Sequence, residues 1–261
     1  MEIFHALVLG IVQGLTELLP ISSSAHLFLI PWVFNWTVPE YFDVALHFGT
    51  LLAIGIFFFK DWIELIKGGY KKAVKKEDST EGRMFWYIVI ATIPGGAIGF
   101  LLDHFAEDLL TNQFIIAIAL IVMGIILYIV DKNSKSETEY KDMNFKQTFL
   151  IGLSQALAFI PGVSRSGVTM TTARAMGIKR ESAAKYSFML SAPIVLAATV
   201  FKFKDFVFDL PFIMGVLSSF IAGIIVIKFL LNYLQKGSFK CFAKYRMVIG
   251  LMVLILAFTR I

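Results

Sequence analysis

The chain has 261 residues, of which 57% are hydrophobic and only 16% are charged. Soluble domains carry about one-quarter charged residues, so this composition excludes a disordered chain and an ordinary water-soluble enzyme, and it indicates a polytopic membrane protein. The single cysteine excludes an internal disulfide and a cysteine-rich metal cluster, and the formal charge of +5 resides in short loops between apolar runs rather than in a nucleic-acid-binding patch.

The first apolar region, residues 3–34, is interrupted near its middle. An apolar stretch is followed by Pro20, three serines at positions 22–24 and a second short apolar stretch. Neither stretch is long enough to cross a hydrocarbon core of about 30 Å. Broken backbone at membrane depth is tolerated only where it lines a cavity or is buried in protein. We therefore expect a re-entrant helix hairpin over residues 3–34.

The rest of the chain contains six apolar segments and a second interrupted one. The second interruption, within residues 147–177, consists of Pro161, Gly162 and the run Ser164-Arg165-Ser166-Gly167, and it predicts a second re-entrant hairpin. The six apolar segments are predicted to cross the membrane once their flanking lysines and acids reach the interfaces. They cover residues 44–59, 84–102, 109–130, 186–201, 210–227 and 243–261.

The loop charges predict the orientation of these segments. Loops 60–83, 131–146 and 234–246 are rich in Lys and Arg and are expected in the cytoplasm, whereas connections 35–43 and 103–112 contain neither residue and are expected outside. The first hairpin then enters from outside and the second from inside. Arg174, Lys179, Arg180, Lys185 and Arg246 are interpreted mainly as inward topology charges.

The predicted architecture is an all-α polytopic membrane protein with a single integral-membrane domain over residues 1–261. Its two halves, about 1–140 and 141–261, are each expected to form a re-entrant helix hairpin followed by three transmembrane helices. Together they would constitute an inverted-topology repeat, with a functional site near the bilayer midplane.

The two interruptions are the candidate functional sites. A helix that begins at membrane depth presents N–H groups without intrahelical acceptors and the positive end of its dipole, so it attracts anions. Phosphate fits best, because Arg165 adds a guanidinium that can bind its oxygens bidentately. Alternatively, the serines only cap the helices and Arg165 pairs with a buried carboxylate such as Glu17. The residues expected to bind the anion are Ser22, Ser23, Ser24, Gly162, Ser164, Arg165, Ser166 and Gly167.

Four more polar side chains accompany the breaks. Gln13 and Glu17 lie one helical turn apart on the same face. Glu17 can exchange a proton or ligate a divalent cation, while Gln13 can orient a phosphate or a metal-bound water, or simply pack between helices. His26, on the first turn after the serines, can serve as acid, base or nucleophile, or pack. His47, four residues after Asp43, belongs either to a satisfied buried pair or to the support of the site.

At these residues the chain resembles the bacterial undecaprenyl-pyrophosphate phosphatase family, the one associated with bacitracin resistance. Supporting similarity at residues 43–50, 91–94 and 187–193 extends the resemblance over essentially the whole chain. The family's acidic motif begins with Glu or Gln, and Gln13 leaves Glu17 as the only carboxylate of the pair. The matching stretches are Gln13-Gly-Leu-Thr-Glu17-Leu-Leu-Pro20-Ile-Ser22-Ser23-Ser24-Ala-His26 and Pro161-Gly162-Val-Ser164-Arg165-Ser166-Gly167-Val-Thr169.

The resemblance implies a multi-pass enzyme of the cell membrane that hydrolyses undecaprenyl pyrophosphate to the monophosphate plus phosphate and so recycles the lipid carrier for cell-wall synthesis. It also implies an interdigitated inverted-repeat fold. Ser23 or His26 would be the nucleophile or general base, and Glu17 the acid–base or metal-linked carboxylate. Ser164 and Arg165 would hold the diphosphate, and magnesium or calcium would be the divalent cation.

Two further readings stay open at this point. A secondary transporter or lipid flippase with a midplane anion site shares the same architecture, and a non-catalytic lipid-binding scaffold would bind the pyrophosphate without cleaving it. For the enzyme we expect a site that opens to the outer face. The oligomeric state is left open.

Overall fold

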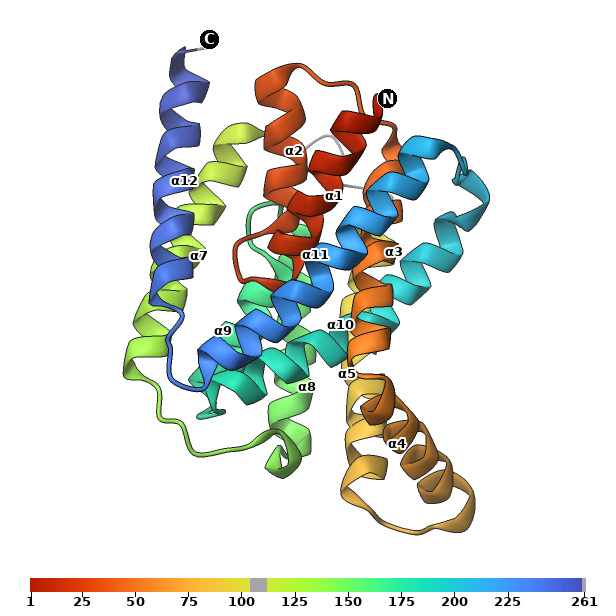
Figure 1. The fold of residues 1–261 in the computed structure, drawn as a ribbon. Helices are drawn as coiled ribbons and strands as arrows, with labels where there is room; N and C mark the ends of the chain where they lie inside the picture. The colour runs from red at the N-terminus through yellow and green to blue at the C-terminus, as the bar shows by residue number, and fades with distance from the viewer. Residues whose placement is uncertain (104–111, 260–261) are drawn as a thin grey trace.

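The computed structural model describes residues 1–103 and 112–259 of the chain (Figure 1). Within these ranges the regular structure is helical and no strand occurs. Most of the predicted outer connection 103–112, the first residues of the predicted span 109–130 and the last two residues of the span 243–261 lie outside the described residues.

The first hairpin consists of α1 (Ile3–Leu18) and α2 (Ser23–Phe34). Leu19 is extended (φ −78°, ψ 147°), as expected for a residue before proline, so α1 ends before Pro20. The remaining elements of the first half are α3 (Glu40–Phe57), α4 (Phe59–Tyr70), the π-helical turn η1 (Lys71–Lys75), α5 (Thr80–Asp103) and α7 (Gln113–Asn133).

The second hairpin repeats this local pattern. Ile160 is extended before Pro161 (ψ 114°), and α9 begins four residues after that proline. The elements of the second half are η2 (Tyr140–Asp142), α8 (Phe145–Ser154), η3 (Gln155–Phe159), α9 (Arg165–Ala175), α10 (Arg180–Lys202), η4 (Phe203–Asp205), α11 (Leu210–Leu234) and α12 (Lys240–Thr259).

Five of the described helices are long and apolar enough to cross a membrane: α3, α7, α10 together with η4, α11 and α12. They coincide with five of the six predicted spans. The sixth predicted span, residues 84–102, forms a single helix within α5. The predicted class is confirmed, and the chain is an all-α, multi-pass membrane protein.

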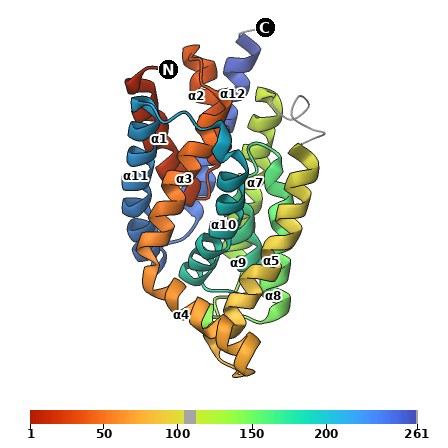
Figure 2. The same ribbon diagram turned by 90° about the vertical axis from the view of Figure 1, so that its right-hand side faces the viewer.

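The predicted loop 60–83 is largely helical. It forms α4, η1 and the start of α5, which pack together and project from one end of the molecule (Figures 1 and 2). Lys60 and Lys67, two of the lysines that suggested a loop, lie on the exposed side of α4, whereas Leu65 is buried on the opposite side. Such an amphipathic pattern stabilises a helix against a neighbouring one.

The two hairpins enter the molecule from opposite ends (Figure 1). The basic segments that join α4 to α5, α7 to α8 and α11 to α12 lie at one end, while both termini and the connection 35–39 lie at the other (Figures 1 and 2). Each hairpin also packs on the other half, because α1 contacts α11 and α8 contacts α5. The symmetry that relates halves 1–140 and 141–261 stays a prediction.

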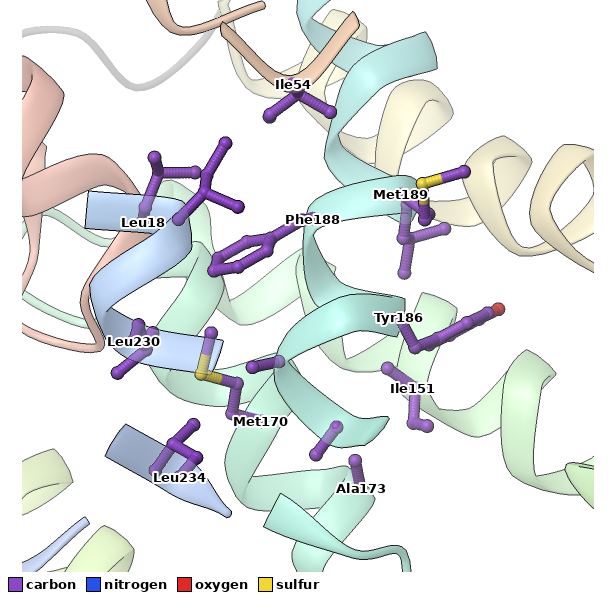
Figure 3. Packing of buried hydrophobic residues seen from close by; sticks show 14 of the residues in the cluster. Leu18, Ile54, Ile151, Met170, Ala173, Tyr186, Phe188, Met189, Leu230 and Leu234 are labelled. Carbon is purple, nitrogen blue, oxygen red and sulfur yellow. The ribbon is translucent and has the colours of Figure 1, made fainter. Parts of the chain in front are cut away.

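The largest buried cluster lies next to both breaks and fixes the hairpins on the spanning helices. Figure 3 shows Phe188 of α10 with its ring directed toward Leu18 of α1 and Leu230 of α11. Met170 of α9 belongs to the same cluster. Because lipid is as apolar as these side chains, their contribution comes mainly from close packing. The cluster thereby positions the end of α1 relative to α9.

Candidate active site

The two breaks share an unusual backbone geometry. The residues that cap α2 and α9, Ser22 and Ser164, have positive φ angles of 75° and 72°. The Ser22 hydroxyl accepts a hydrogen bond from the Ala25 N–H (3.4 Å), and the Ser164 hydroxyl accepts one from the Gly167 N–H (3.0 Å). Left-handed backbone in residues other than glycine is strained and concentrates at functional sites. The two breaks therefore have the same local structure, in which a serine with a positive φ angle caps the helix that follows.

Glu17 joins the two breaks through its carboxylate. Ser23 Oγ donates to Oε2 at 2.5 Å, and the Arg165 guanidinium donates to Oε1. Gln13 Nε2 also donates to Oε2 (3.2 Å), and His47 Nε2 lies 3.3 Å from the same oxygen. The expected convergence of the two helix starts is thus present. Arg165 also pairs with the Glu17 carboxylate, as the alternative interpretation of the sequence predicted.

A pocket of about 260 Å³ opens beside this carboxylate. Its apolar walls come from α3, η3 and α10. An arginine, a histidine and serines from both helix starts can therefore reach one bound group, and both helix starts lie beside the pocket. The polar lining residues are Glu17, Ser23, Ser24, His47, Ser164 and Arg165.

A larger pocket of about 600 Å³ adjoins the first. The two share Ser24 and His47 in their linings. Apolar side chains of α2, among them Phe28 and Trp32, make much of its wall, and it extends to the connection 35–39. The polar pocket therefore continues into an apolar one.

His26 does not line the polar pocket. Its Nδ1 lies 2.7 Å from the Ser22 carbonyl oxygen and its Nε2 lies 2.8 Å from the Tyr245 hydroxyl, so both ring nitrogens have protein partners. The imidazole also stacks on the Tyr245 ring, with an interplanar angle of 11°. The structure thus directs His26 toward α12, whereas Ser23 lines the polar pocket.

The other predicted anion-binding residues hold the breaks rather than line the pocket. Ser166 Oγ donates to the Leu19 carbonyl across the two hairpins (2.9 Å). Gly162 has φ 94°, and a Cβ there would lie 2.6 Å from the Ile116 carbonyl oxygen of α7, so glycine is required at this position. Ser22 caps α2, and Gly167 packs on Arg246.

The interpretation of Arg246 and Arg174 as loop topology charges is wrong, because both side chains are fully buried. Arg246 donates to backbone carbonyls of both breaks. Arg174 pairs with Asp131 (2.9 Å) and holds the connection that follows α7. In the sequence, each arginine lies near the end of a predicted apolar segment. At such a position the sequence pattern is the same whether the charge is buried or exposed.

His47, whose role the sequence left undecided, lines both pockets. Its Nδ1 donates to the Asp43 backbone carbonyl oxygen (2.7 Å) rather than to the Asp43 carboxylate, and its Nε2 faces Glu17. The four-residue spacing of Asp43 and His47 therefore reflects a side-chain-to-backbone contact within one helical turn. It orients the imidazole toward the pocket.

The oxygens near Glu17 suit a divalent cation only if the substrate supplies further ligands. No group of three or more His, Cys, Asp or Glu side chains able to hold a metal exists among residues 1–103 and 112–259. The Gln13 Oε1 atom, beside Glu17, is buried without a hydrogen-bond partner. One carboxylate and one amide oxygen are compatible with magnesium, which commonly takes its remaining ligands from phosphates and water.

Comparison with known proteins identifies the family. Residues 6–252 match the family described as Bacitracin resistance protein BacA. The undecaprenyl-diphosphatase of Pelotomaculum thermopropionicum is 51% identical over 264 aligned positions, which cover 100% of this chain and 98% of that protein. The undecaprenyl-diphosphatases of Desulforudis audaxviator and Caldicellulosiruptor bescii are each 44% identical, with coverage of 100% and 97% of both chains, respectively. The chain therefore belongs to the bacitracin resistance protein BacA family.

Proposed function

We propose that this protein is an undecaprenyl-diphosphatase of the cell membrane, which hydrolyses undecaprenyl pyrophosphate to undecaprenyl phosphate and inorganic phosphate and so recycles the lipid carrier. The observation that carries the proposal is the meeting of Ser23 and Arg165, each the first residue of its helix, on one carboxylate beside one pocket. Family membership and the names of the similar proteins agree with it.

The diphosphate binds between the two helix starts. Two sets of first-turn N–H groups and the Arg165 guanidinium supply the positive potential that this polyanion needs. Arg165 is partly accessible from the pocket, with 16% of its side chain exposed. A phosphate group can therefore compete with Glu17 for the guanidinium and leave the carboxylate free to accept a proton.

Ser23 attacks the terminal phosphorus. Its proton passes to Glu17 Oε2, to which the hydroxyl is already hydrogen-bonded, and the bridging P–O bond breaks. Glu17 returns the proton to the departing lipid phosphate. In the second half of the reaction Glu17 takes a proton from water, which attacks the phosphoserine. The Ser23 Oγ–P bond breaks, Glu17 returns the proton to Ser23 Oγ, and inorganic phosphate is released. Arg165 and the two helix starts stabilise the charge on the transferred group, the dominant requirement in phosphoryl transfer.

His26 and His47 take supporting roles in this scheme. His26 is bonded to the Ser22 carbonyl and to Tyr245, so it positions the cap of α2 and does not attack. His47 keeps the Glu17 carboxylate oriented toward Ser23. A divalent cation, magnesium or calcium, would be held by Glu17 and Gln13 Oε1 beside the substrate phosphates. When bound, it neutralises part of the diphosphate charge.

The apolar pocket next to the site receives the isoprenoid chain nearest the diphosphate. It extends to connection 35–39, which lacks Lys and Arg, at the end of the molecule opposite the basic segments. The positive-inside rule places that end outside the cytoplasm. The site accordingly opens to the outer face, where it would meet substrate from the outer leaflet.

Phosphate release by the purified protein in detergent tests this function. Detergent solution has no transmembrane gradient, so release of phosphate from a polyprenyl pyrophosphate identifies a hydrolase and not a transporter or flippase. Arg165→Ala should reduce kcat/KM by about 100-fold or more, because it removes a contact that strengthens as charge develops. Arg83→Ala, which removes an exposed arginine paired with Asp78, should keep full activity. Equal turnover by the folded wild type and Arg165→Ala would refute the assigned role.

A further inference from the structure

We propose that Arg246 is a positioning residue for the diphosphate site: its guanidinium ties the two helix breaks together and thereby sets the spacing of the two anion-binding helix starts. The inference rests on the proposed function and adds to it a residue outside both hairpins. Arg246 lies in α12, a spanning helix that contributes no side chain to the polar pocket.

One guanidinium reaches both breaks. Arg246 Nη1 donates to the Pro20 carbonyl of the first break at 3.1 Å, and Nη2 donates to the Gly162 and Val163 carbonyls of the second at 2.8 and 2.9 Å. Arginine presents its donors in a rigid planar fork. These bonds are satisfied together only if the carbonyls keep fixed relative positions, so the side chain acts as a spacer between the hairpins.

The burial and charge of Arg246 support a specific role rather than a fortuitous contact. The side chain is 0% exposed, and within the described part of the chain no carboxylate forms an ion pair with it. A buried charge without a counter-ion is expensive. Here the backbone carbonyls of the breaks compensate it. Those carbonyls carry negative partial charge next to the helix starts that must bind an anion, and the guanidinium offsets it.

The surrounding residues leave room for this contact and reinforce it. A Cβ on Gly167 would lie 2.5 Å from Arg246 Nη1, so the absence of a side chain there makes space for the guanidinium. The preceding residue, Tyr245, contacts His26, which in turn contacts the cap of α2. Two consecutive residues of α12 thus hold the breaks in place.

Small movements of the breaks would be transmitted directly to the pocket. Ser23 begins α2 three residues after Pro20, and Arg165 begins α9 two residues after Val163. Misplacement of reacting groups by about 1 Å can cost about 100-fold in rate. Loss of the spacer should therefore weaken diphosphate binding as well as turnover in molecules that remain folded.

The test compares Arg246→Lys and Arg246→Gln with the control Arg174→Lys. Arg174 is equally buried and also donates to backbone carbonyls, but its partners lie in the connections after α7 and α9, away from the breaks. Each variant is measured in detergent for its folded fraction, for phosphate release, and for the Kd of a methylene-bridged, non-hydrolysable farnesyl diphosphate analogue. Gly167→Ala, which would displace the end of Arg246, is a fourth variant that remains informative if the arginine variants fold poorly.

The Kd of the analogue should rise about tenfold or more in Arg246→Lys, which is a loss of about 1.4 kcal/mol of binding free energy, because lysine keeps the charge but lacks the planar fork of donors. The Kd should rise further in Arg246→Gln, because glutamine also lacks the charge. Gly167→Ala should shift Kd in the same direction. Arg174→Lys should lower the folded fraction only, with an unchanged Kd per folded molecule. A wild-type Kd in the folded Arg246 and Gly167 variants would overturn the inference. A wild type that neither binds the analogue nor releases phosphate would instead overturn the proposed function.

Discussion

At the scale of single residues, the site depends on how one carboxylate is shared. Glu17 accepts from Ser23 and Arg165 and lies next to His47, although only 6% of the residue is exposed. Burial of a carboxylate is costly unless cations and hydrogen bonds compensate it. The arrangement gives Glu17 two opposing effects on the substrate. In the proposed reaction it is the base for Ser23, and it competes with phosphate for Arg165.

Glu17→Gln separates these two effects. Glutamine keeps the size of the side chain but cannot take the Ser23 proton, so kcat should fall by about 100- to 10,000-fold, the range usual for general-base removal. Arg165 would lose its anionic competitor, and the Kd of the non-hydrolysable analogue should fall or stay the same. Phosphate release and analogue binding by the same preparation check both parts. Unchanged turnover would remove Glu17 from the chemistry, and weaker binding would show that it helps to place Arg165.

At the scale of elements, the predictable features were those with local causes. The breaks follow from Pro20, Pro161 and the serine caps, and the spans follow from apolar length. Both breaks and five of the six predicted spans appear where the sequence predicted them. The helical character of α4 was missed because its lysines resembled loop charges, although they occupy one face of an amphipathic helix.

The missed contacts have non-local causes. Arg246 and Pro20 lie 226 positions apart, and the carboxylate that His47 faces at the site, Glu17, lies on another helix. Nothing in the neighbouring residues distinguishes such an arginine from a topology charge. His26 shows the reverse case: it lies near Ser23 in sequence, but its partners on α12 turn it away from the pocket.

The packing of α1 on α11 should control the position of the first break. Gly14 lies between Gln13 and the turn that carries Glu17, and a Cβ there would lie 2.5 Å from both the Ser219 carbonyl oxygen and the Ala222 Cβ. Small residues allow such close approach between membrane helices. Gly14→Leu should cost about 1–3 kcal/mol of stability or more. It should also reduce turnover per folded molecule, because α1 must shift and carry Glu17 with it.

Gly55→Leu is the matched control, since a Cβ at Gly55 of α3 would have no atom within 4 Å. Thermal unfolding in detergent, followed by tryptophan fluorescence, gives the stability, and phosphate release gives the turnover. Gly14→Leu should be impaired in both measurements and Gly55→Leu in neither. Equal behaviour of the two variants would show that the contact between α1 and α11 does not position the site.

At the scale of the whole molecule, the loop charges predict one orientation. The basic segments gather at one end, and the termini with connection 35–39 gather at the other (Figures 1 and 2). Lys and Arg are retained on the cytoplasmic side of membrane proteins. Because the apolar pocket extends to connection 35–39, the orientation of the chain also decides from which side a lipid diphosphate enters.

Thiol labelling can decide this orientation. The chain has a single cysteine, Cys241, which is exposed at the start of α12, at the basic end. A membrane-impermeant maleimide should label it only after the cells are permeabilised. Thr37→Cys in a Cys241→Ser background places the thiol in connection 35–39, at an exposed position, and should react in intact cells. The reverse pattern would place the pocket mouth in the cytoplasm. Hydrolysis would remain possible in that case, but substrate would have to arrive from the inner leaflet, and the loop charges would have failed as orientation signals.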